Sequence, residues 1–259
     1  MNLPVQLVST DFDGTLFAEF ENPPVPEALQ EQLAWLQRQG ATWVINTGRD
    51  LSSLMESIAR ARLTVRPDYV VTVEREIYRH HEHRYEAVGE WNDRCTQEHA
   101  VLFDEVRAAL AEVVAWVDQN FEADVYTDVY SPFCLIARNN PDADAIQEYF
   151  GAFCRRFPRL AFVRNDVYAR LSHVAYNKGT ALAEICRRVG VRAEHVLAAG
   201  DHLNDLPMLS REFARWLVAP SNAVPQVKAR VLEQEGYVSH QHCGHGVAKG
   251  LELLLRGLR

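Results

Sequence analysis

Residues 5–15 read VQLVSTDFDGT, an apolar run that ends in two aspartates and a glycine. The apolar, β-branched run Val5–Thr10 is typical of a strand buried inside a sheet. Asp11 follows the run directly, and a tight turn at Gly14 can point both Asp11 and Asp13 into one crevice. This stretch therefore predicts a buried strand that leads straight into a polar site.

After the aspartate pair, strands and helices alternate in the first part of the chain and again in its last part. The elements predicted from apolar spacing are a helix at 26–39, a strand at 41–46, a helix at 51–61, a strand at 69–73, a helix at 178–190, strands at 195–199 and 217–219, and a helix at 247–258. Such alternation is typical of a parallel sheet with helical crossovers. The predicted fold class is α/β, with a Rossmann-like parallel sheet and helices on both faces.

The middle of the chain lacks this alternation. The pattern there predicts a hairpin at 76–88, a helix at 91–120, strands within 125–138, a helix at 141–156 and a strand at 160–164. We therefore expect residues 84–171 to form an inserted α/β domain. Residues 1–83 and 172–259 are expected to form the domain that carries Asp11.

The composition excludes several classes of protein. The 259 residues carry a formal net charge of −8 and no Lys/Arg-rich run, so a nucleic-acid partner is not expected. No stretch approaches the roughly 20 apolar residues of a membrane span, so no membrane partner is expected. Five scattered cysteines without a CxxC pair are typical of a reduced protein, and we expect a cytoplasmic location. The oligomeric state is not predicted.

Acidic and polar residues follow three of the predicted strands: Asp11, Thr47 and Asp201. In open parallel sheets, ligands bind in the crevice outside the carboxyl ends of the strands, so these residues are expected to converge. Asp13 and Asp205 bring the number of carboxylates there to four. Hard oxygen ligands of this kind suit Mg²⁺, which binds through carboxylates, water and a substrate phosphate.

Two further side chains at this site suit a phosphate group. Thr47 supplies a hydroxyl donor, and Lys178 supplies a compact cation. A lysine at the start of a helix is unfavourable to the helix dipole, which favours a special role for Lys178. An acidic protein that handles a phosphorylated substrate needs positive charge concentrated in this way, from a metal and a few cations.

These residues lie in four motifs: DFDGT at 11–15, NTGR at 46–49, NKGTAL at 177–182 and GDHLND at 200–205. A DxD pair alone is common, but the four motifs in this order resemble the haloacid dehalogenase superfamily of phosphatases. The long insert resembles the α/β cap of subfamily IIB, the Cof-like subgroup that contains sucrose-phosphate and other sugar-phosphate phosphatases. Glu76-Ile77-Tyr78 and Trp91 are similar to the sucrose-phosphatase branch.

The resemblance implies a catalytic and a metal-binding role for the aspartates. Asp11 would attack phosphorus and form an aspartyl-phosphate, while Asp13 would act as general acid and then general base. Mg²⁺ would be held by Asp11, by the backbone carbonyl of Asp13 and by Asp201, with Asp205 binding directly or through water.

The resemblance also implies a phosphate cradle of Thr47, Gly48, Lys178 and Asn204. The expected activity is therefore Mg²⁺-dependent hydrolysis of a small phosphorylated metabolite, most simply a sugar phosphate. A phosphotransferase or phosphomutase could use the same intermediate. A non-catalytic protein that binds phosphorylated ligands is the alternative outside enzymes, although a binder has no need of a nucleophile.

Several residues are left with two interpretations. Arg49 could line the site or pair with an acid. His80, His81 and His83 are expected in a solvated hairpin. The loop at 240–245 has histidine and cysteine spacings that could bind zinc, but Gly244 and Gly246 favour a flexible loop, and no role is assigned to it. Polar residues of the insert could contact a sugar or lie in loops: Arg138, Asn139, Asn165, Asp166 and Tyr168.

Overall fold

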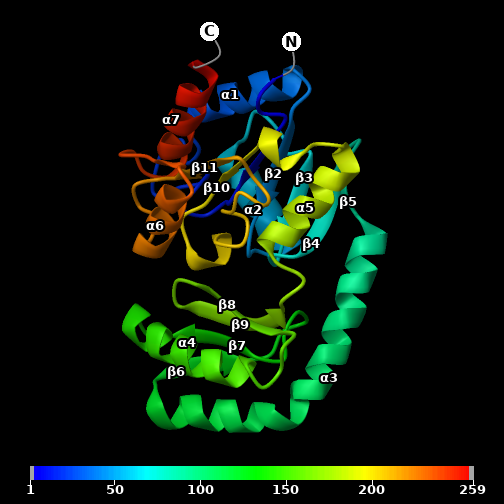
Figure 1. The fold of residues 1–259 in the computed structure, drawn as a ribbon, viewed down its shortest axis with the longest axis vertical. Helices are drawn as coiled ribbons and strands as arrows, with labels where there is room; N and C mark the ends of the chain where they lie inside the picture. Colours follow the sequence, from blue (N-terminus) through cyan, green and yellow to red (C-terminus); the bar gives the residue numbers. More distant parts are fainter. Residues whose placement is uncertain (1–2, 257–259) are drawn as a thin grey trace. The chain divides into compact units, whose positions relative to one another are not determined.

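The computed structural model describes residues 3–256, which separate into two compact units (Figure 1). The core unit contains the chain up to Val88 and from Lys178 onward. The insert unit is Gly89–Asn177. Among the helices within the described residues, none combines the length and the apolar character needed to cross a membrane.

The core unit is built on an eight-stranded sheet. In spatial order its strands are β12 (Tyr237–Val238), β11 (Trp216–Ala219), β10 (Val196–Ala199), β1 (Leu7–Thr10), β2 (Thr42–Asn46), β3 (Tyr69–Thr72), β4 (Glu76–His81) and β5 (Arg84–Ala87). The first six are parallel, and the hairpin β4–β5 adds an antiparallel edge. The predicted α/β fold class with a parallel sheet is confirmed.

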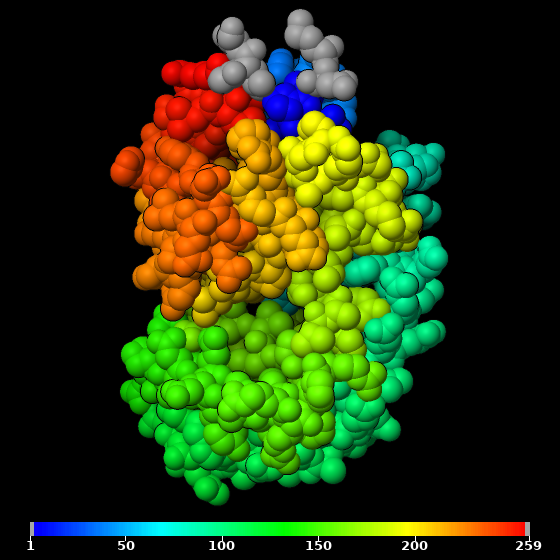
Figure 2. All heavy atoms as spheres, viewed as in Figure 1, coloured from blue at the N-terminus to red at the C-terminus, as the bar shows by residue number. Residues whose placement is uncertain are grey.

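Helices cover this sheet because both of its faces are apolar. They are α1 (Glu27–Arg38), α2 (Leu51–Ala61), α5 (Lys178–Val189), α6 (Pro225–Glu233) and α7 (Cys243–Arg256). Val8 and Ile45 share one core with Leu33 of α1 and Val247 of α7. In the view of Figure 2 the surface of the core unit consists mainly of the chain from α5 to α7, and the buried strands lie beneath it.

The strand register brings distant segments to one edge of the sheet. Thr10, the last residue of β1, lies opposite Ile45 of β2 and Ala199 of β10. Since these three neighbouring strands run parallel, the residues that follow them emerge at the same edge. The segments after β1, β2 and β10 therefore meet there, although the first and last are almost 200 positions apart in the sequence.

The insert unit packs two helices with an antiparallel sheet. The sheet has the order β6 (Ala123–Tyr126), β7 (Cys134–Ala137), β9 (Tyr168–His173) and β8 (Leu160–Asn165), and the helices are α3 (Gly89–Asn120) and α4 (Asn140–Cys154). Its core is aromatic, with Phe133 and Phe150 fully buried and the rings of Phe150 and Phe162 stacked 4.3 Å apart. Asn139 caps α4 by accepting a hydrogen bond from the backbone N–H of Asp142.

The sequence patterns missed two strands and one α-helix. β9 was not predicted because polar residues interrupt its apolar pattern, yet it pairs with both β7 and β8. The helix α6, which begins at Pro225 and buries Val227 and Val231, and the two-residue strand β12 were also missed. Each is short, so pairing and burial in the folded chain decide its structure more than local preference does.

The interpretation of Gly244 and Gly246 as marks of a flexible loop was wrong. Both lie in the first turn of α7. A Cβ atom on Gly244 would lie 2.5 Å from Cδ of Pro26, and one on Gly246 would lie 2.5 Å from the carbonyl oxygen of Gln241. These glycines therefore permit close packing of a helix and do not loosen the chain.

The two compact units divide the chain a few residues later than the predicted boundaries at 83/84 and 171/172. β5 belongs to the core sheet because it pairs with β4. His173 and Tyr176 belong to the insert unit, since their rings pack with those of His99 and Trp91. A short apolar pattern cannot distinguish an edge hairpin of one sheet from the start of another domain.

Candidate active site

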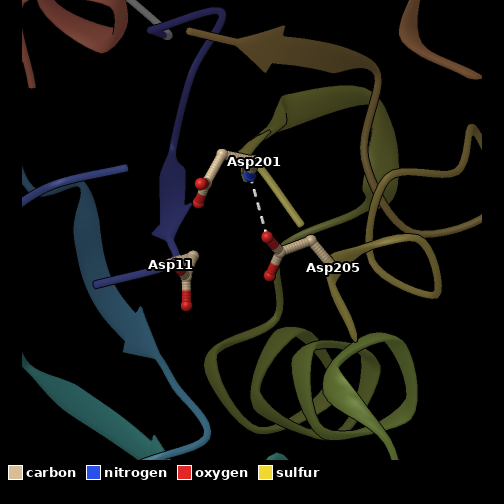
Figure 3. Close-up of side chains that lie close together, drawn as sticks. All are labelled: Asp11, Asp201 and Asp205. Atoms are coloured by element: carbon tan, nitrogen blue, oxygen red, sulfur yellow. Dashed lines mark hydrogen bonds between the residues drawn. The ribbon is translucent and has the colours of Figure 1, made fainter. Parts of the chain in front are cut away.

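Three aspartates gather at the carboxyl edge of the core sheet (Figure 3). Asp11 follows β1, Asp201 follows β10, and Asp205 lies in the short 3-10 helix Leu203–Asp205. Each offers a carboxylate oxygen, and these oxygens all lie within 4.8 Å of one another. The sequence-based expectation that these segments converge is therefore met by the geometry.

Asp205 is held on both of its oxygens. Oδ2 accepts hydrogen bonds from the backbone N–H groups of Asp201 and His202, at 2.8 and 2.9 Å. Oδ1 accepts one from Nζ of Lys178 at 2.6 Å. A Cβ atom on Gly200 would lie 2.5 Å from Cβ of Asp205, so only glycine leaves room for this side chain. Asp205 is thus a fixed anchor of the site.

Lys178 places one cation between two carboxylates. It is the first residue of α5, it is completely buried, and its Nζ also donates to Oδ1 of Asp11 at 2.6 Å. Burial lowers the pKa of Lys178, but the adjacent Asp11 and Asp205 carboxylates more than offset this effect and raise it. The ammonium group therefore stays charged and orients Asp11.

One lysine cannot neutralise three carboxylates. Burial, and then repulsion from Asp205, raise the pKa of Asp11 well above its usual value. The same two causes raise the pKa of Asp201 to about 7. A cation bound between clustered carboxylates stabilises their ionised forms, and the oxygen atoms of these carboxylates suit Mg²⁺. Asp11, Asp201 and Asp205 could therefore hold that ion.

Asp201 is oriented by neighbours from two other segments. Its Oδ1 accepts a hydrogen bond from Oγ1 of Thr15 at 2.7 Å, and its Oδ2 lies 3.2 Å from Nδ2 of Asn222. Asn222 also donates to the carbonyl oxygen of Gly14 at 2.8 Å. Gly14 has a φ of +74°, and a Cβ atom there would lie 2.5 Å from Asp201. The turn after Asp13 therefore requires glycine for both conformation and space.

Asp13 stands apart from this cluster of carboxylates. Its Oδ2 and Oδ1 accept hydrogen bonds from Nε and Nη2 of Arg49, at 2.6 and 2.7 Å. Nη1 of Arg49 donates to the hydroxyl groups of Ser53 and Ser57 on α2. The site predicted from four carboxylates is thus a cluster of three and a separate Arg49–Asp13 pair. Of the two interpretations of Arg49, pairing with an acid is the one found.

The residues predicted to bind phosphate lie on the same edge of the sheet. Thr47 is buried, and its hydroxyl accepts a hydrogen bond from the backbone N–H of Arg49 at 3.2 Å. A Cβ atom on Gly48 would lie 3.7 Å from Nδ2 of Asn204, so these two residues are neighbours. The side chain of Asn46 donates to the carbonyl oxygen of Lys178 at 2.9 Å, which ties the end of β2 to the start of α5.

Sequence reasoning missed Thr15, Glu74 and Asn222. Glu74 follows β3 and its side chain accepts a hydrogen bond from Nδ2 of Asn204 at 3.3 Å. Asn222 follows β11 in the same manner. The rule that ligands bind beyond the carboxyl ends of parallel strands applies equally to β3 and β11, so it could have indicated both residues.

Several of the other histidines and of the polar residues of the insert have structural partners. His242 and His245 each pair with Glu21, and neither joins a possible metal-binding group within residues 3–256. His81 lies at the end of β4, in the predicted hairpin. In the insert unit Asn139 caps α4, and the side chain of Asn140 donates to Oδ1 of Asp166.

Comparisons with known proteins agree with this fold and identify a family. The haloacid dehalogenase-like hydrolase family matches residues 105–251, which is more than half of the chain. The family of sucrose-6F-phosphate phosphohydrolase matches residues 4–124. "Putative phosphatase YxeH" of Bacillus subtilis (strain 168) is 22% identical over 276 residues, covering 96% of this chain and 98% of that protein.

Two solved structures show the same fold. The sucrose-phosphatase of Synechocystis sp. PCC6803, in complex with sucrose and phosphate, has a TM-score of 0.72 at 18% identity and covers 96% of this chain and 98% of its own. A haloacid dehalogenase-like hydrolase from Bacteroides thetaiotaomicron has a TM-score of 0.63 at 20% identity and covers 96% and 99%. With its fold, its aspartate cluster and the family match over more than half of its length, the chain belongs to the haloacid dehalogenase-like hydrolases.

Proposed function

We propose that this hydrolase is a Mg²⁺-dependent phosphatase that cleaves a small phosphate monoester through a phosphorylated Asp11. The observation that carries the proposal is the contact of buried Asp11 with Lys178 inside a cluster of acids. A structural carboxylate gains little from such surroundings, because burial and like charges oppose its ionisation. A nucleophile that must be held close to a phosphate group benefits from the adjacent cation.

The residues of the chain account for two steps. In the first, a carboxylate oxygen of Asp11 bonds to phosphorus while the bond from phosphorus to the ester oxygen breaks, and Asp13 gives its proton to the departing oxygen. In the second, a water oxygen bonds to phosphorus, Asp13 takes up the proton of that water, and the bond between Asp11 and phosphorus breaks. Inorganic phosphate and an alcohol are released, and Asp11 and Asp13 return to their starting states.

Asp13 has to leave Arg49 in order to act. Both of its oxygens are engaged by the guanidinium group, while the acid role requires a proton on one of them. The two side chains are 39% and 30% exposed, so water or a substrate can reach the pair. We propose that Asp13 exchanges its hydrogen bonds to Arg49 for one to the ester oxygen of the substrate.

The remaining residues hold and balance charge. We assign Thr47, Gly48, Lys178 and Asn204 to the phosphoryl oxygens. When bound by Asp11, Asp201 and Asp205, and by the backbone carbonyl of Asp13, Mg²⁺ would neutralise the negative charge that otherwise repels a phosphate group.

We propose a sugar phosphate as the substrate. The similarity of residues 4–124 to sucrose-6F-phosphate phosphohydrolase supports this choice, as does the likeness in fold to a sucrose-phosphatase. We further propose that the insert unit acts as a cap that selects the leaving group, as caps over catalytic sites do.

The test is hydrolysis of p-nitrophenyl phosphate with and without Mg²⁺, by the wild type and by Asp11→Asn. We expect kcat of the variant to fall by at least about a thousandfold, because removing a nucleophile removes the main covalent route. The matched control is Asp118→Asn, which alters an exposed acid on α3 and should leave kcat within about twofold. Activity that survives in Asp11→Asn would contradict the mechanism. Transfer of the phosphoryl group to added glycerol, in place of release to water, would indicate a phosphotransferase.

A further inference from the structure

Glu74 lies on a strained turn at the carboxyl end of β3. The three residues Val73, Glu74 and Arg75 connect β3 to β4. Val73 has a φ of +44° and Glu74 a φ of +63°. Residues other than glycine rarely adopt this region, and it is especially unfavourable for a β-branched residue such as Val73. Such conformations persist only where the surroundings impose them, and they are concentrated at functional sites.

Two backbone hydrogen bonds attach this turn to the segment Thr47–Arg49. The N–H of Val73 donates to the carbonyl oxygen of Arg49 at 2.9 Å, and the N–H of Glu74 donates to that of Thr47 at 3.0 Å. Glu74 is therefore positioned from the same segment that supplies Thr47 and Gly48 to the proposed phosphate cradle.

The side chain of Glu74 lies against the cradle itself. Its Oε1 accepts a hydrogen bond from Nδ2 of Asn204 at 3.3 Å. A Cβ atom on Gly48 would lie 2.7 Å from the same oxygen. A carboxylate here adjoins two of the groups assigned to the phosphoryl oxygens, and its charge would repel the phosphate.

Glu74 is buried without a matching cation. It is 7% exposed, and among the described residues its carboxylate accepts only the hydrogen bond from Asn204 and has no lysine, arginine or histidine nitrogen within 4.0 Å. An ionised carboxylate can accept about four hydrogen bonds, so Glu74 retains acceptor capacity for a donor of the substrate. Both steps of the proposed hydrolysis use Asp11 and Asp13, and neither step uses Glu74.

We propose that Glu74 is a specificity-determining residue that accepts a hydrogen bond from the leaving group of the substrate. A side chain beside the residues assigned to the phosphoryl oxygens lies close to the ester oxygen and to the first atoms of the leaving group. Glu74 therefore selects phosphate monoesters whose leaving group carries a hydrogen-bond donor, a hydroxyl or an ammonium group, near the phosphorylated carbon. This inference rests on the proposed function and narrows its substrate class.

The test compares kcat/KM of the wild type and Glu74→Gln on two kinds of probe. Glycerol 3-phosphate, glucose 6-phosphate, sucrose 6F-phosphate and O-phosphoethanolamine carry donors near the phosphorylated carbon, whereas p-nitrophenyl phosphate carries none on its leaving group. The amide side chain of the variant can still accept the hydrogen bond of Asn204 but lacks the charge and one acceptor oxygen. We expect the preference for the best donor-bearing probe over p-nitrophenyl phosphate to fall about 10- to 100-fold, the range for a hydrogen bond to a charged group.

The activity on p-nitrophenyl phosphate should change by less than about threefold, and inhibition by inorganic phosphate should be as strong or stronger, since a like charge is removed. A preference for O-phosphoethanolamine over glycerol 3-phosphate that Glu74→Gln removes identifies the donor as ammonium. Loss of preference on both of these probes alike identifies it as hydroxyl. The matched control is Glu76→Gln, two residues away, whose carboxylate accepts a hydrogen bond from the hydroxyl of Tyr78.

Three results would overturn the inference. They are a wild type that prefers no donor-bearing probe, an equal loss on all probes together with weaker phosphate inhibition, and an equal effect of Glu76→Gln. The second of these would make Glu74 a positioning residue for Asn204. Glu74→Gly guards against misfolding, because glycine adopts a φ of +63° without strain, and it should show the same loss of preference. Failure of the proposed function is a separate result, since it appears as activity that survives Asp11→Asn.

Discussion

The core unit contains a buried cluster of charged groups, whereas most ion pairs of the insert unit lie at its surface. In the core unit Lys178 and Asp205 are completely buried, and Asp11 is 6% exposed. In the insert unit the pair Arg156–Glu112 has a similar distance, 2.8 Å, but both side chains are about half exposed. An exposed ion pair costs little to form and stabilises little, whereas a buried one must overcome a large desolvation penalty.

The difference favours the core unit as the place of the proposed chemistry. The insert unit is held together by an aromatic core around Phe133 and Phe150, which needs no charge. Its one nearly buried arginine, Arg164, is fully engaged by neighbours that include Gln147 and the carbonyl oxygen of Asp166. The core unit instead retains carboxylates whose pKa values are raised by burial and by one another. Charges that are costly to bury and incompletely balanced are typical of active sites.

The largest expected difference between the two units follows from removing one cation from each of them. Lys178→Met leaves Asp11 and Asp205 buried without a counter-charge, so we expect a loss of about 3–5 kcal/mol in the free energy of unfolding, together with nearly all activity. Arg156→Met removes the exposed pair and should cost about 0–1 kcal/mol. Urea unfolding at pH 8 without metal measures both. Equal losses in the two variants would refute the contrast.

The next largest expected effect is stabilisation of the core unit by a divalent cation. If Mg²⁺ binds the aspartate cluster, a concentration about 100 times its Kd stabilises the folded protein by about 2.7 kcal/mol, seen as a rise in Tm. Because burial and Asp205 raise the pKa of Asp201 to about 7, protons compete with the ion below that pH, and the rise should be smaller at pH 6 than at pH 8.

Asp201→Asn tests the assignment of the ion to this cluster. The variant should lose most of the Mg²⁺-dependent rise in Tm, while Asp118→Asn in the insert unit should retain it. A rise that persists in Asp201→Asn would place the ion elsewhere. This readout does not depend on the activity of the enzyme.

The smallest expected effect is a pH response in the insert unit. Burial lowers the pKa of His173, an effect that Glu98 and Glu105 oppose and Arg159 supports. Below its ordinary pKa of 6.5 the unfolded state then binds more protons than the folded one. Stability from this group is therefore present above pH 6.5 and is lost as the pH falls through the lowered pKa of the folded state.

His173→Asn should flatten this dependence. The N–H of Ala175 donates to Nδ1 of His173 at 3.1 Å, and the side-chain oxygen of asparagine can replace that acceptor. Amide hydrogen exchange in β9 between pH 5 and pH 8 measures the response of the insert unit. An unchanged pH dependence in the variant would show that another group is responsible.

Much of the site followed from the order of elements along the chain. Asp11, Thr47 and Asp201 were found because each follows a strand of a parallel sheet, and the carboxyl ends of such strands share one edge. Their convergence follows from two facts alone: the strands run in the same direction, and they are neighbours in the sheet. The hairpin and the helix at 51–61 also agree with the structure, since strong local patterns specify them.

Other features depend on distances that no local pattern encodes. Both Asp13 and Asp201 are carboxylates that follow buried strands, yet Asp13 is bound by Arg49 while Asp201 joins the cluster. Lys178 could be identified as a cation near phosphate, but its bridging of Asp11 and Asp205 required the start of α5 to lie beside the ends of β1 and β10. Glu74 is an ordinary turn residue in the sequence.

The sequence by itself determined the α/β class, the four motifs and the identity of the aspartates, because these depend on periodicity and spacing along the chain. Only the tertiary structure decided which aspartates share a cation, which one is paired with arginine, and that Glu74 lies buried against Asn204. The reason is the distance over which each kind of interaction acts. Strand and helix patterns act over a few residues, whereas burial and electrostatic interactions depend on the distances that remain after the whole chain has packed.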